Sequence, residues 1–164
     1  MMEVLTYPNE ILKQKSAAVE QITAEEIDQL NQMYDLMKAS NGVGLAAPQV
    51  GILKRMVVIQ TDEKQEPLKM INPKITARSS DIILFNEGCL SVPGEYHDVT
   101  RYAAIKFQYT NINGELVESE AEELLAVCIQ HEIDHLDGKL FIDRLSKGQR
   151  SKLLKKYFEK QEQK

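Results

Sequence analysis

The residues with the clearest chemical potential are His131-Glu132-Ile133-Asp134-His135. On an α-helix, residues four positions apart lie one turn apart and only about 40° apart around the axis, so both imidazoles can bind the same ion. Glu132 lies about 100° from the first histidine, and its side chain can reach a bound water without being a ligand itself. This spacing is typical of metal-assisted hydrolysis.

A third ligand is needed, and Cys89 in Glu87-Gly88-Cys89-Leu90-Ser91 is the strongest candidate. Two histidines and one thiolate leave the fourth position of a tetrahedral ion open for water, which is the arrangement of a catalytic site. Four protein ligands would close the ion off and make it structural.

Cys128 offers that rival arrangement, because it lies three residues before His131 on roughly the same helix face and can complete a Cys₂His₂ site. Its neighbours Ala126, Val127 and Ile129 are apolar, which favours a small buried side chain instead. We expect His97, in a polar segment outside the motif, to be a surface residue in a loop. For Asp134 we favour a salt bridge with Arg101 or Arg144 over a role in orienting a ligand.

The helices and strands that must position these residues follow from apolar spacing. Thr23 and Glu26 form a capping box, and Ile27, Leu30 and Tyr34 recur at helical spacing, which predicts a helix over residues 25–39. Asn113-Gly114 predicts a hairpin turn. Short segments rich in β-branched or aromatic residues predict strands at 56–59, 82–85, 103–109 and 115–118. Further helices are predicted over 121–136, which carries the metal motif, and from about Ser146 to the end.

Composition indicates one α+β globular domain spanning residues 1–164, with 43% hydrophobic and 27% charged residues. No apolar run approaches the roughly 20 residues of a membrane span, and the first residues lack the pattern of a signal peptide, so we expect a cytoplasmic protein. In a reducing compartment, a disulfide between Cys89 and Cys128 is disfavoured.

Charge is unevenly distributed along the chain. The net charge is −5, yet residues 147–164 hold seven Lys or Arg and two Glu, so this predicted C-terminal helix is strongly basic. Such a segment is most often a solvated helix face, and the alternative is an electrostatic partner site.

Three motifs together resemble the signature motifs of the peptide deformylase family, in the family's order and spacing. They are Gly42-Val43-Gly44-Leu45-Ala46-Ala47-Pro48-Gln49, Glu87-Gly88-Cys89-Leu90-Ser91 and Gln130-His131-Glu132-Ile133-Asp134-His135. The opening Val4-Leu5-Thr6-Tyr7-Pro8 and the basic last helix are also similar, so the resemblance covers nearly the whole chain. Three independent motifs make a chance match very improbable.

The resemblance implies small antiparallel sheets around a central metal-bearing helix, flanked by an N-terminal and a C-terminal helix. It also implies removal of the formyl group from N-terminal formylmethionine. Cys89, His131 and His135 would bind one divalent metal, Fe²⁺ by family preference, with Zn²⁺, Ni²⁺ or Co²⁺ as substitutes. Glu132 would be the general acid and base, and Gln49 with the Leu90 backbone N–H would stabilise the oxyanion.

The expected partners are N-formylmethionyl peptides and nascent chains. The substrate backbone is expected to lie like an added strand against the Val43-Gly44 and Gly88 segments. A ribosome contact through residues 147–164 follows from the resemblance, whereas no membrane and no sequence-specific nucleic acid is expected as a partner. The candidate substrate pocket comprises Val43, Gly44, Phe85, Gly88, Leu124, Val127 and Cys128.

Two rival functions fit the metal motif alone. A zinc peptidase would cut internal peptide bonds in a longer cleft. A non-enzymatic module with a closed Cys₂His₂ zinc would leave Glu132 without a role.

Overall fold

Two antiparallel sheets lie on either side of one buried helix in the computed structural model, which describes residues 1–163. The helices are α1 (Ala24–Ala39), α2 (Glu123–Leu136) and α3 (Lys147–Glu162), with short 3₁₀ helices η1 (Glu10–Lys13), η2 (Ala47–Val50) and η3 (Phe141–Arg144). The strands are β1 (Gly44–Ala46), β2 (Met56–Ile59), β3 (Leu68–Arg78), β4 (Ile82–Cys89), β5 (Val92–Tyr102), β6 (Ala104–Thr110) and β7 (Leu116–Glu122).

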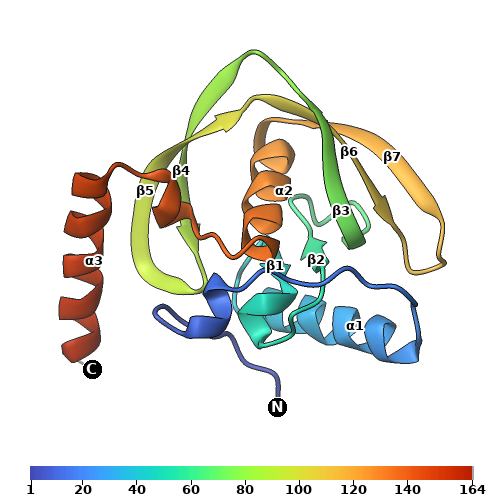
Figure 1. Cartoon of the computed structure of the whole chain (residues 1–164), viewed down its shortest axis with the longest axis horizontal. Helices are drawn as coiled ribbons and strands as arrows, with labels where there is room; N and C mark the ends of the chain where they lie inside the picture. The colour runs from blue at the N-terminus through green and yellow to red at the C-terminus, as the bar shows by residue number, and fades with distance from the viewer. Residues whose placement is uncertain (164) are drawn as a thin grey trace.

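The larger sheet has the strand order β1-β2-β3-β6-β7, and the smaller sheet is the β4–β5 hairpin. Helix α2 contacts strands of both sheets and runs through the middle of Figure 1, with α1 below it and α3 outside the β4–β5 hairpin. The expected α+β class, with small antiparallel sheets and flanking helices, is confirmed.

The helix ends follow the local signals in the sequence. At the start of α1, the Thr23 hydroxyl accepts from the Glu25 N–H, and the Glu26 carboxylate accepts from the Thr23 N–H, which completes the capping box. Ser146 and Gln149 form the same motif at the start of α3. Leu30, Met33 and Met37 point from α1 into an apolar cluster with β1 and β2. The predicted boundaries of both helices are therefore confirmed to within a residue or two.

Helix α2 begins two residues later than predicted. Ala121 and Glu122 continue strand β7, where they pair with Ile105 and Ala104 of β6. The backbone then turns sharply at Glu123, whose φ is 56°. Most of the helix that follows is buried, so its apolar pattern is broad rather than one-sided.

The largest error of the sequence prediction concerns β5. No strand was predicted there, and His97 was expected in a loop. Residues 96–102 pair with β4 in register, as in Glu87↔His97, and after a register shift at Gly88 the pairing resumes at Cys89↔Val92. One face of this hairpin is exposed to solvent, so polar residues occupy alternate positions and obscure the strand pattern. Strand β3 and the short β1 were also missed. The turn at Asn113-Gly114 is confirmed, with Gly114 at φ 81°.

Within the described residues, no helix has the combined length and hydrophobicity needed to span a bilayer.

Candidate metal centre

Three metal-ligating side chains converge where the end of β4 meets α2. The Sγ atom of Cys89 lies 3.4 Å from Nε2 of His135, and the Nε2 atoms of His131 and His135 are 3.2 Å apart. All three ligand atoms lie within 4.8 Å of one another, and this is the only such group found in residues 1–163. The i, i+4 spacing on α2 and the tight turn after β4 thus bring the predicted ligands together.

The donor set fits one transition-metal ion. Both imidazole Nε2 atoms and the thiol face a common point, an arrangement that hydrogen bonds alone do not require. Imidazole and thiolate ligands suit Zn²⁺, Fe²⁺ and related ions. Burial lowers the pKa of His135 well below its ordinary value, so its ring is neutral, as a metal ligand must be.

The surroundings of His131 favour positive charge. Burial opposes it, but Glu132, Cys89 and Glu87 together raise the pKa of His131 well above its ordinary value. The same cluster of negative groups would favour a bound cation at this point.

A network of charged side chains supports the metal ligands from behind. Nδ1 of His131 lies 2.8 Å from Oε1 of Glu87, which fixes the ring so that Nε2 faces the other ligands. Arg101 binds Glu87 with two hydrogen bonds of 2.6 and 2.9 Å, and it donates a third to Asp134 at 2.7 Å. Asp134 also accepts from Arg144, at 2.6 and 3.0 Å. The predicted Asp134 salt bridge is therefore confirmed, with both candidate arginines.

Burial of this network changes the pKa of its members. Burial alone would raise the pKa of Glu87, but hydrogen bonds and charge from Arg101 and His131 bring it down to about 2. Glu87 is therefore ionised at neutral pH and can hold the imidazole in one orientation.

Glu132 lacks any such partner. Its Oε1 atom is buried without a hydrogen bond to any of residues 1–163, and burial raises its pKa to about 7. A carboxyl group with this pKa can both accept and release a proton at neutral pH. Gly44 makes room for it, because a Cβ atom there would lie 2.5 Å from Glu132 Oε2. The absence of a side chain at Gly44 therefore leaves space for the Glu132 carboxylate. The sequence alone did not reveal this requirement for glycine.

Gln49 reaches the same centre from η2. Its Oε1 accepts from the Ala46 N–H at 3.0 Å, which orients the amide. Its Nε2 donates to Ser91 Oγ at 3.0 Å and lies 3.5 Å from Cys89 Sγ. Gln49 is 2% exposed, so it is not the surface amide that its type alone would suggest.

A cleft of about 420 Å³ opens beside these groups. Each candidate substrate residue lines it, as do Gln49, Leu90, Cys89, His131 and Glu132. Apolar side chains from α2 and β4 form one wall: Leu124, Val127, Cys128 and Phe85. The sequence motifs, which are distributed between residues 42 and 135, therefore face one space.

Two other predictions concern residues outside the metal group. Cys128 lines the cleft and is not among the three convergent ligands found in residues 1–163, so the closed Cys₂His₂ arrangement is not supported. Burial raises the pKa of its thiol to about 12. His97 is likewise outside the metal group, but it lies in β5 rather than in a loop.

Sequence reasoning named Arg101 only as a partner of Asp134, and it missed the link from Arg101 through Glu87 to His131. Glu87 precedes Cys89 by two residues on a strand, so both side chains lie on the same face, and this signal was available. The pairing of Arg101 with Glu87 gave no such signal because β5 itself was not predicted.

Comparison with known proteins supplies the context. The sequence model described as polypeptide deformylase matches residues 1–151. A peptide deformylase from Phenylobacterium zucineum is 45% identical over 157 residues, covering 94% of this chain and 93% of the relative. One from Helicobacter pylori is 43% identical over 169 residues, covering 99% and 97%.

Solved structures agree with these sequence matches. The crystal structure of a peptide deformylase from Ehrlichia chaffeensis in complex with actinonin is similar at a TM-score of 0.93 and 36% identity, covering 98% of this chain and 97% of that one. One from Synechococcus elongatus, also with actinonin, has a TM-score of 0.90 and 40% identity, covering 94% and 86%.

Proposed function

Because the chain belongs to the polypeptide deformylase family, we propose that Glu132 is the general acid and base of its reaction. That reaction is the metal-dependent hydrolysis that removes the formyl group from N-formylmethionine at a protein N-terminus. The observation that carries this proposal is the unpartnered, buried Oε1 of Glu132 beside three convergent metal ligands and a cleft.

Cys89, His131 and His135 are the side chains that would hold the ion. When bound there, a divalent cation would activate a water molecule and polarise the formyl group. Support comes from the donor set, and from Glu87, which orients His131. We propose Fe²⁺ as the ion in the cell, with Zn²⁺, Ni²⁺ or Co²⁺ as substitutes, because the family prefers iron and these ligands suit all four.

Glu132 would transfer the proton in both halves of the reaction. It accepts a proton as the water oxygen attacks the formyl carbon, and it then delivers that proton to the departing amine nitrogen as the C–N bond breaks. The products are formate and a free N-terminus. A pKa of about 7 suits both steps, because the carboxyl group is readily ionised and readily protonated at neutral pH.

Gln49 and Leu90 would stabilise the charge that develops on the formyl oxygen. Gln49 Nε2 donates one hydrogen to Ser91 Oγ at 3.0 Å and the other, in a longer bond of 3.5 Å, to Cys89 Sγ in the metal group, where the oxyanion could replace the sulfur as acceptor. Together with the backbone N–H of Leu90, Gln49 Nε2 would donate to the oxyanion, and each donor is typically worth about 3 kcal/mol.

The methionine side chain would enter the apolar part of the cleft beside Leu124, Val127 and Cys128. Strand β1 is the edge of the larger sheet, so an extended peptide can add as a strand along the Val43-Gly44 segment, although the Val43 carbonyl already accepts from the Gln60 N–H. Gly88 on β4 lines the opposite side. Recognition through the peptide backbone would tolerate many sequences after methionine, as formylated nascent chains require.

Formate release from formyl-Met-Ala-Ser by anaerobically purified protein, with metal analysis of the same sample, tests this function. We expect one metal ion per chain and formate release, with no cleavage of an unformylated peptide at internal bonds. Internal cleavage would support the zinc peptidase instead. Metal without any formate release would contradict the proposal.

We also propose that residues 1–164 act as one catalytic unit in the cytoplasm. Both cysteines are free thiols, and the reaction needs Cys89 reduced as a ligand.

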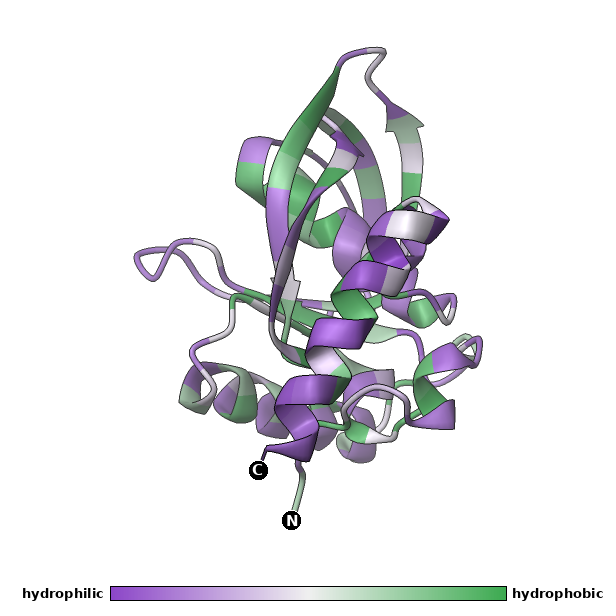
Figure 2. Ribbon diagram, turned by 90° about the vertical axis from the view of Figure 1, so that its left-hand side faces the viewer, coloured by the Kyte–Doolittle hydropathy of each residue, from purple (hydrophilic) through white to green (hydrophobic). Residues whose placement is uncertain are grey.

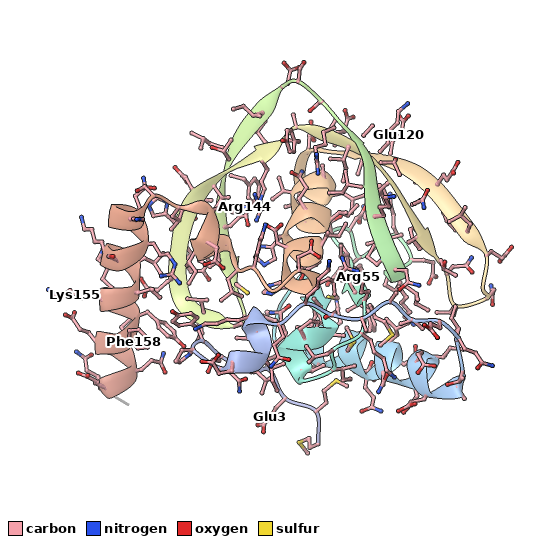
Figure 3. All side chains as sticks on the ribbon, viewed as in Figure 1. Glu3, Arg55, Glu120, Arg144, Lys155 and Phe158 are labelled. Atoms are coloured by element: carbon pink, nitrogen blue, oxygen red, sulfur yellow. The ribbon has the colours of Figure 1, made fainter. Side chains whose placement is uncertain are left out.

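The basic helix α3 is proposed to contact the ribosome, where formylated chains emerge. Most of its ribbon has the hydrophilic colour in Figure 2, and Figure 3 shows Lys155 directed away from the protein body. Lys152, Lys155 and Lys156 are exposed and have no ion-pair partner within residues 1–163. Unpaired cations on one helix can bind phosphate groups of RNA without reading the base sequence.

Charge reversal tests this contact better than deletion, because deletion would also remove Leu153 and Tyr157, whose buried side chains pack α3 against the apolar cluster with β5 and η3. We expect K152E/K155E/K156E to lose ribosome binding while it retains formate release from the tripeptide. The triple variant K15E/K64E/K74E, made at exposed lysines elsewhere, is the matched control. Equal ribosome binding by both variants at several salt concentrations would contradict the proposed contact.

A further inference from the structure

The N-terminal segment crosses two parts of the metal centre and is hydrogen-bonded to both. The backbone N–H of Leu5 donates to the Gln49 carbonyl at 2.7 Å. Two residues later, the N–H of Tyr7 donates to the Ser91 carbonyl at 2.8 Å. Gln49 supplies one proposed oxyanion donor, and Ser91 directly follows Leu90, which supplies the other.

These two donor segments belong to different sheets. Gln49 lies in η2, which follows β1 of the five-stranded sheet, whereas Leu90 and Ser91 form the turn of the β4–β5 hairpin. No strand pairing in the described chain joins β1 to β4 or β5, so sheet hydrogen bonds do not fix the distance between the two donors. Besides the segment 5–7, two hydrogen bonds from Gln49 Nε2 join them in the described chain, one to Ser91 Oγ and a longer one to Cys89 Sγ.

The segment is itself anchored on the opposite side. The hydroxyl of Tyr157 in α3 donates to the Tyr7 carbonyl at 2.8 Å, and the two rings pack edge to face at 6.2 Å. Tyr157 is 1% exposed, and Tyr7 and Cys89 pack against the same apolar cluster. The segment therefore has a fixed position from which its N–H groups hold the two catalytic segments.

We propose that Leu5 and Tyr7 are positioning residues for the hydrolysis, acting through their backbone N–H groups. They hold Gln49 and the Leu90–Ser91 turn at the separation that lets both donors reach one oxyanion. The inference rests on the proposed oxyanion role of Gln49 and Leu90. Donors of this kind act only when they are placed before the reaction, and an error of about 1 Å can cost about 10²-fold in rate.

Replacing single amides by esters tests this proposal in the metal-loaded full chain. An α-hydroxy acid in place of Leu5 removes its N–H and keeps its side chain. We expect kcat to fall about tenfold, with KM and metal content unchanged, because the donors act on the transition state. Unchanged kcat would overturn the proposal.

Thr6 provides the matched ester control. Its N–H has no hydrogen-bond partner in the described chain, and the carbonyls that the two esters weaken, those of Val4 and Leu5, accept no hydrogen bond there either. The Thr6 ester should therefore leave kcat unchanged. An equal loss of kcat in both esters would indicate a general weakening of the segment and would overturn the positioning role.

A double-mutant cycle with Gln49→Ala separates positioning from stability. Once the Gln49 amide is gone, the Leu5 ester has less left to misplace, so its effect on kcat should shrink to about twofold or less, whereas a loss of stability would persist. If Gln49→Ala alone leaves kcat intact, the proposed role of Gln49 fails. If Gln49→Ala lowers kcat and the Leu5 ester multiplies that loss independently, only the positioning role fails.

Tyr157→Phe serves if the Leu5 ester does not fold. It removes the hydroxyl that anchors Tyr7 and keeps the buried ring. We expect a two- to threefold loss of kcat, on the order of a weakened neutral hydrogen bond, that disappears in the Gln49→Ala background. A loss of the same size in both backgrounds would overturn the proposal.

Discussion

The two sides of α2 treat buried polar groups in opposite ways. On the side facing β5, Gln130 exchanges two hydrogen bonds with the backbone of Tyr102, and Asp134 is bound by two arginines. On the side facing the cleft, the Glu132 carboxylate leaves one oxygen without a partner among residues 1–163. The buried polar groups on the β5 side therefore have hydrogen-bond partners, whereas the carboxylate on the cleft side has an oxygen available for proton transfer.

This difference separates the groups that stabilise the fold from those that perform the chemistry. Breaking a buried ion pair leaves an uncompensated charge, so the β5 side is costly to alter. A buried carboxyl group without a partner is already unfavourable, and such groups are typical of functional sites. Changes on the cleft side should therefore affect turnover, and changes on the β5 side should affect stability.

Glu132→Gln should give the largest effect. Loss of the proton-transfer group should lower kcat by about 10²- to 10⁴-fold, while the neutral amide relieves the buried carboxyl group and leaves thermal stability equal or higher. Measurement of kcat, metal content and Tm checks this. Glu120→Gln, at an exposed position labelled in Figure 3, is the control and should leave all three unchanged. A large loss of metal with Glu132→Gln would show that Glu132 is needed for metal binding instead.

Arg101→Met should act mainly on stability, and any loss of turnover should follow from Glu87, which orients His131. It leaves Glu87 and Asp134 buried with fewer partners, which should lower the free energy of unfolding by about 3–5 kcal/mol. Denaturant unfolding measures this value. The control is Arg78→Met, because Arg78 is exposed and stacks only on the Tyr102 ring. Equal stability of the two variants would mean that the β5 side does not stabilise the fold in the way described.

The sequence was most informative where chemistry and helical spacing coincide. His131 and His135 had to share a helix face, and the cap residues marked the starts of α1 and α3, because both signals depend on local geometry. The position of Cys89 beside them came from motif and resemblance, since a contact between distant segments has no local signal.

The remaining parts depend on pairing between distant segments. Strand β5 was missed because its solvent face carries polar residues, and the pairing of Arg101 with Glu87 was missed with it. The contact between Gly44 and Glu132 also joins residues far apart in the chain. The spacing of apolar residues reveals neither the pairing of β5 with β4 nor the contact between Gly44 and Glu132.

Leu124→Ala sharpens the comparison on the cleft side without changing any charge. The smaller side chain should raise KM for formyl-Met peptides by about tenfold and leave kcat nearly unchanged, because it removes apolar contact with methionine. Leu124 is 37% exposed, so little stability should be lost. Steady-state kinetics with formyl-Met and formyl-Ala peptides measure the effect. Leu116→Ala, at an exposed position on β7, is the control, and an equal KM for both variants would exclude Leu124 from the methionine pocket.

Glu26 is a paired carboxylate far from α2, and it should give the smallest effect. Hydrogen bonds from Lys54 and from the Thr23 hydroxyl and N–H lower its pKa from 4.5 to about 2. Because the folded-state pKa is lowered, the stabilisation is fully present above pH 4.5 and is lost as the pH falls towards 2. The difference in Tm between the wild-type protein and Glu26→Gln should therefore be present at neutral pH and shrink across this interval.

Glu118→Gln corrects this measurement for the general change in charge, because Glu118 is exposed and has no ion-pair partner in the described chain. A Tm difference for Glu26→Gln that stays constant down to pH 2 would mean that the capping geometry stabilises α1 without the carboxylate charge. A Tm difference that disappears would mean that the charge of Glu26 stabilises the fold, as the paired charges on the β5 side of α2 do. In either outcome deformylation at neutral pH should be unchanged, because Glu26 lies in α1, outside the residues that line the cleft.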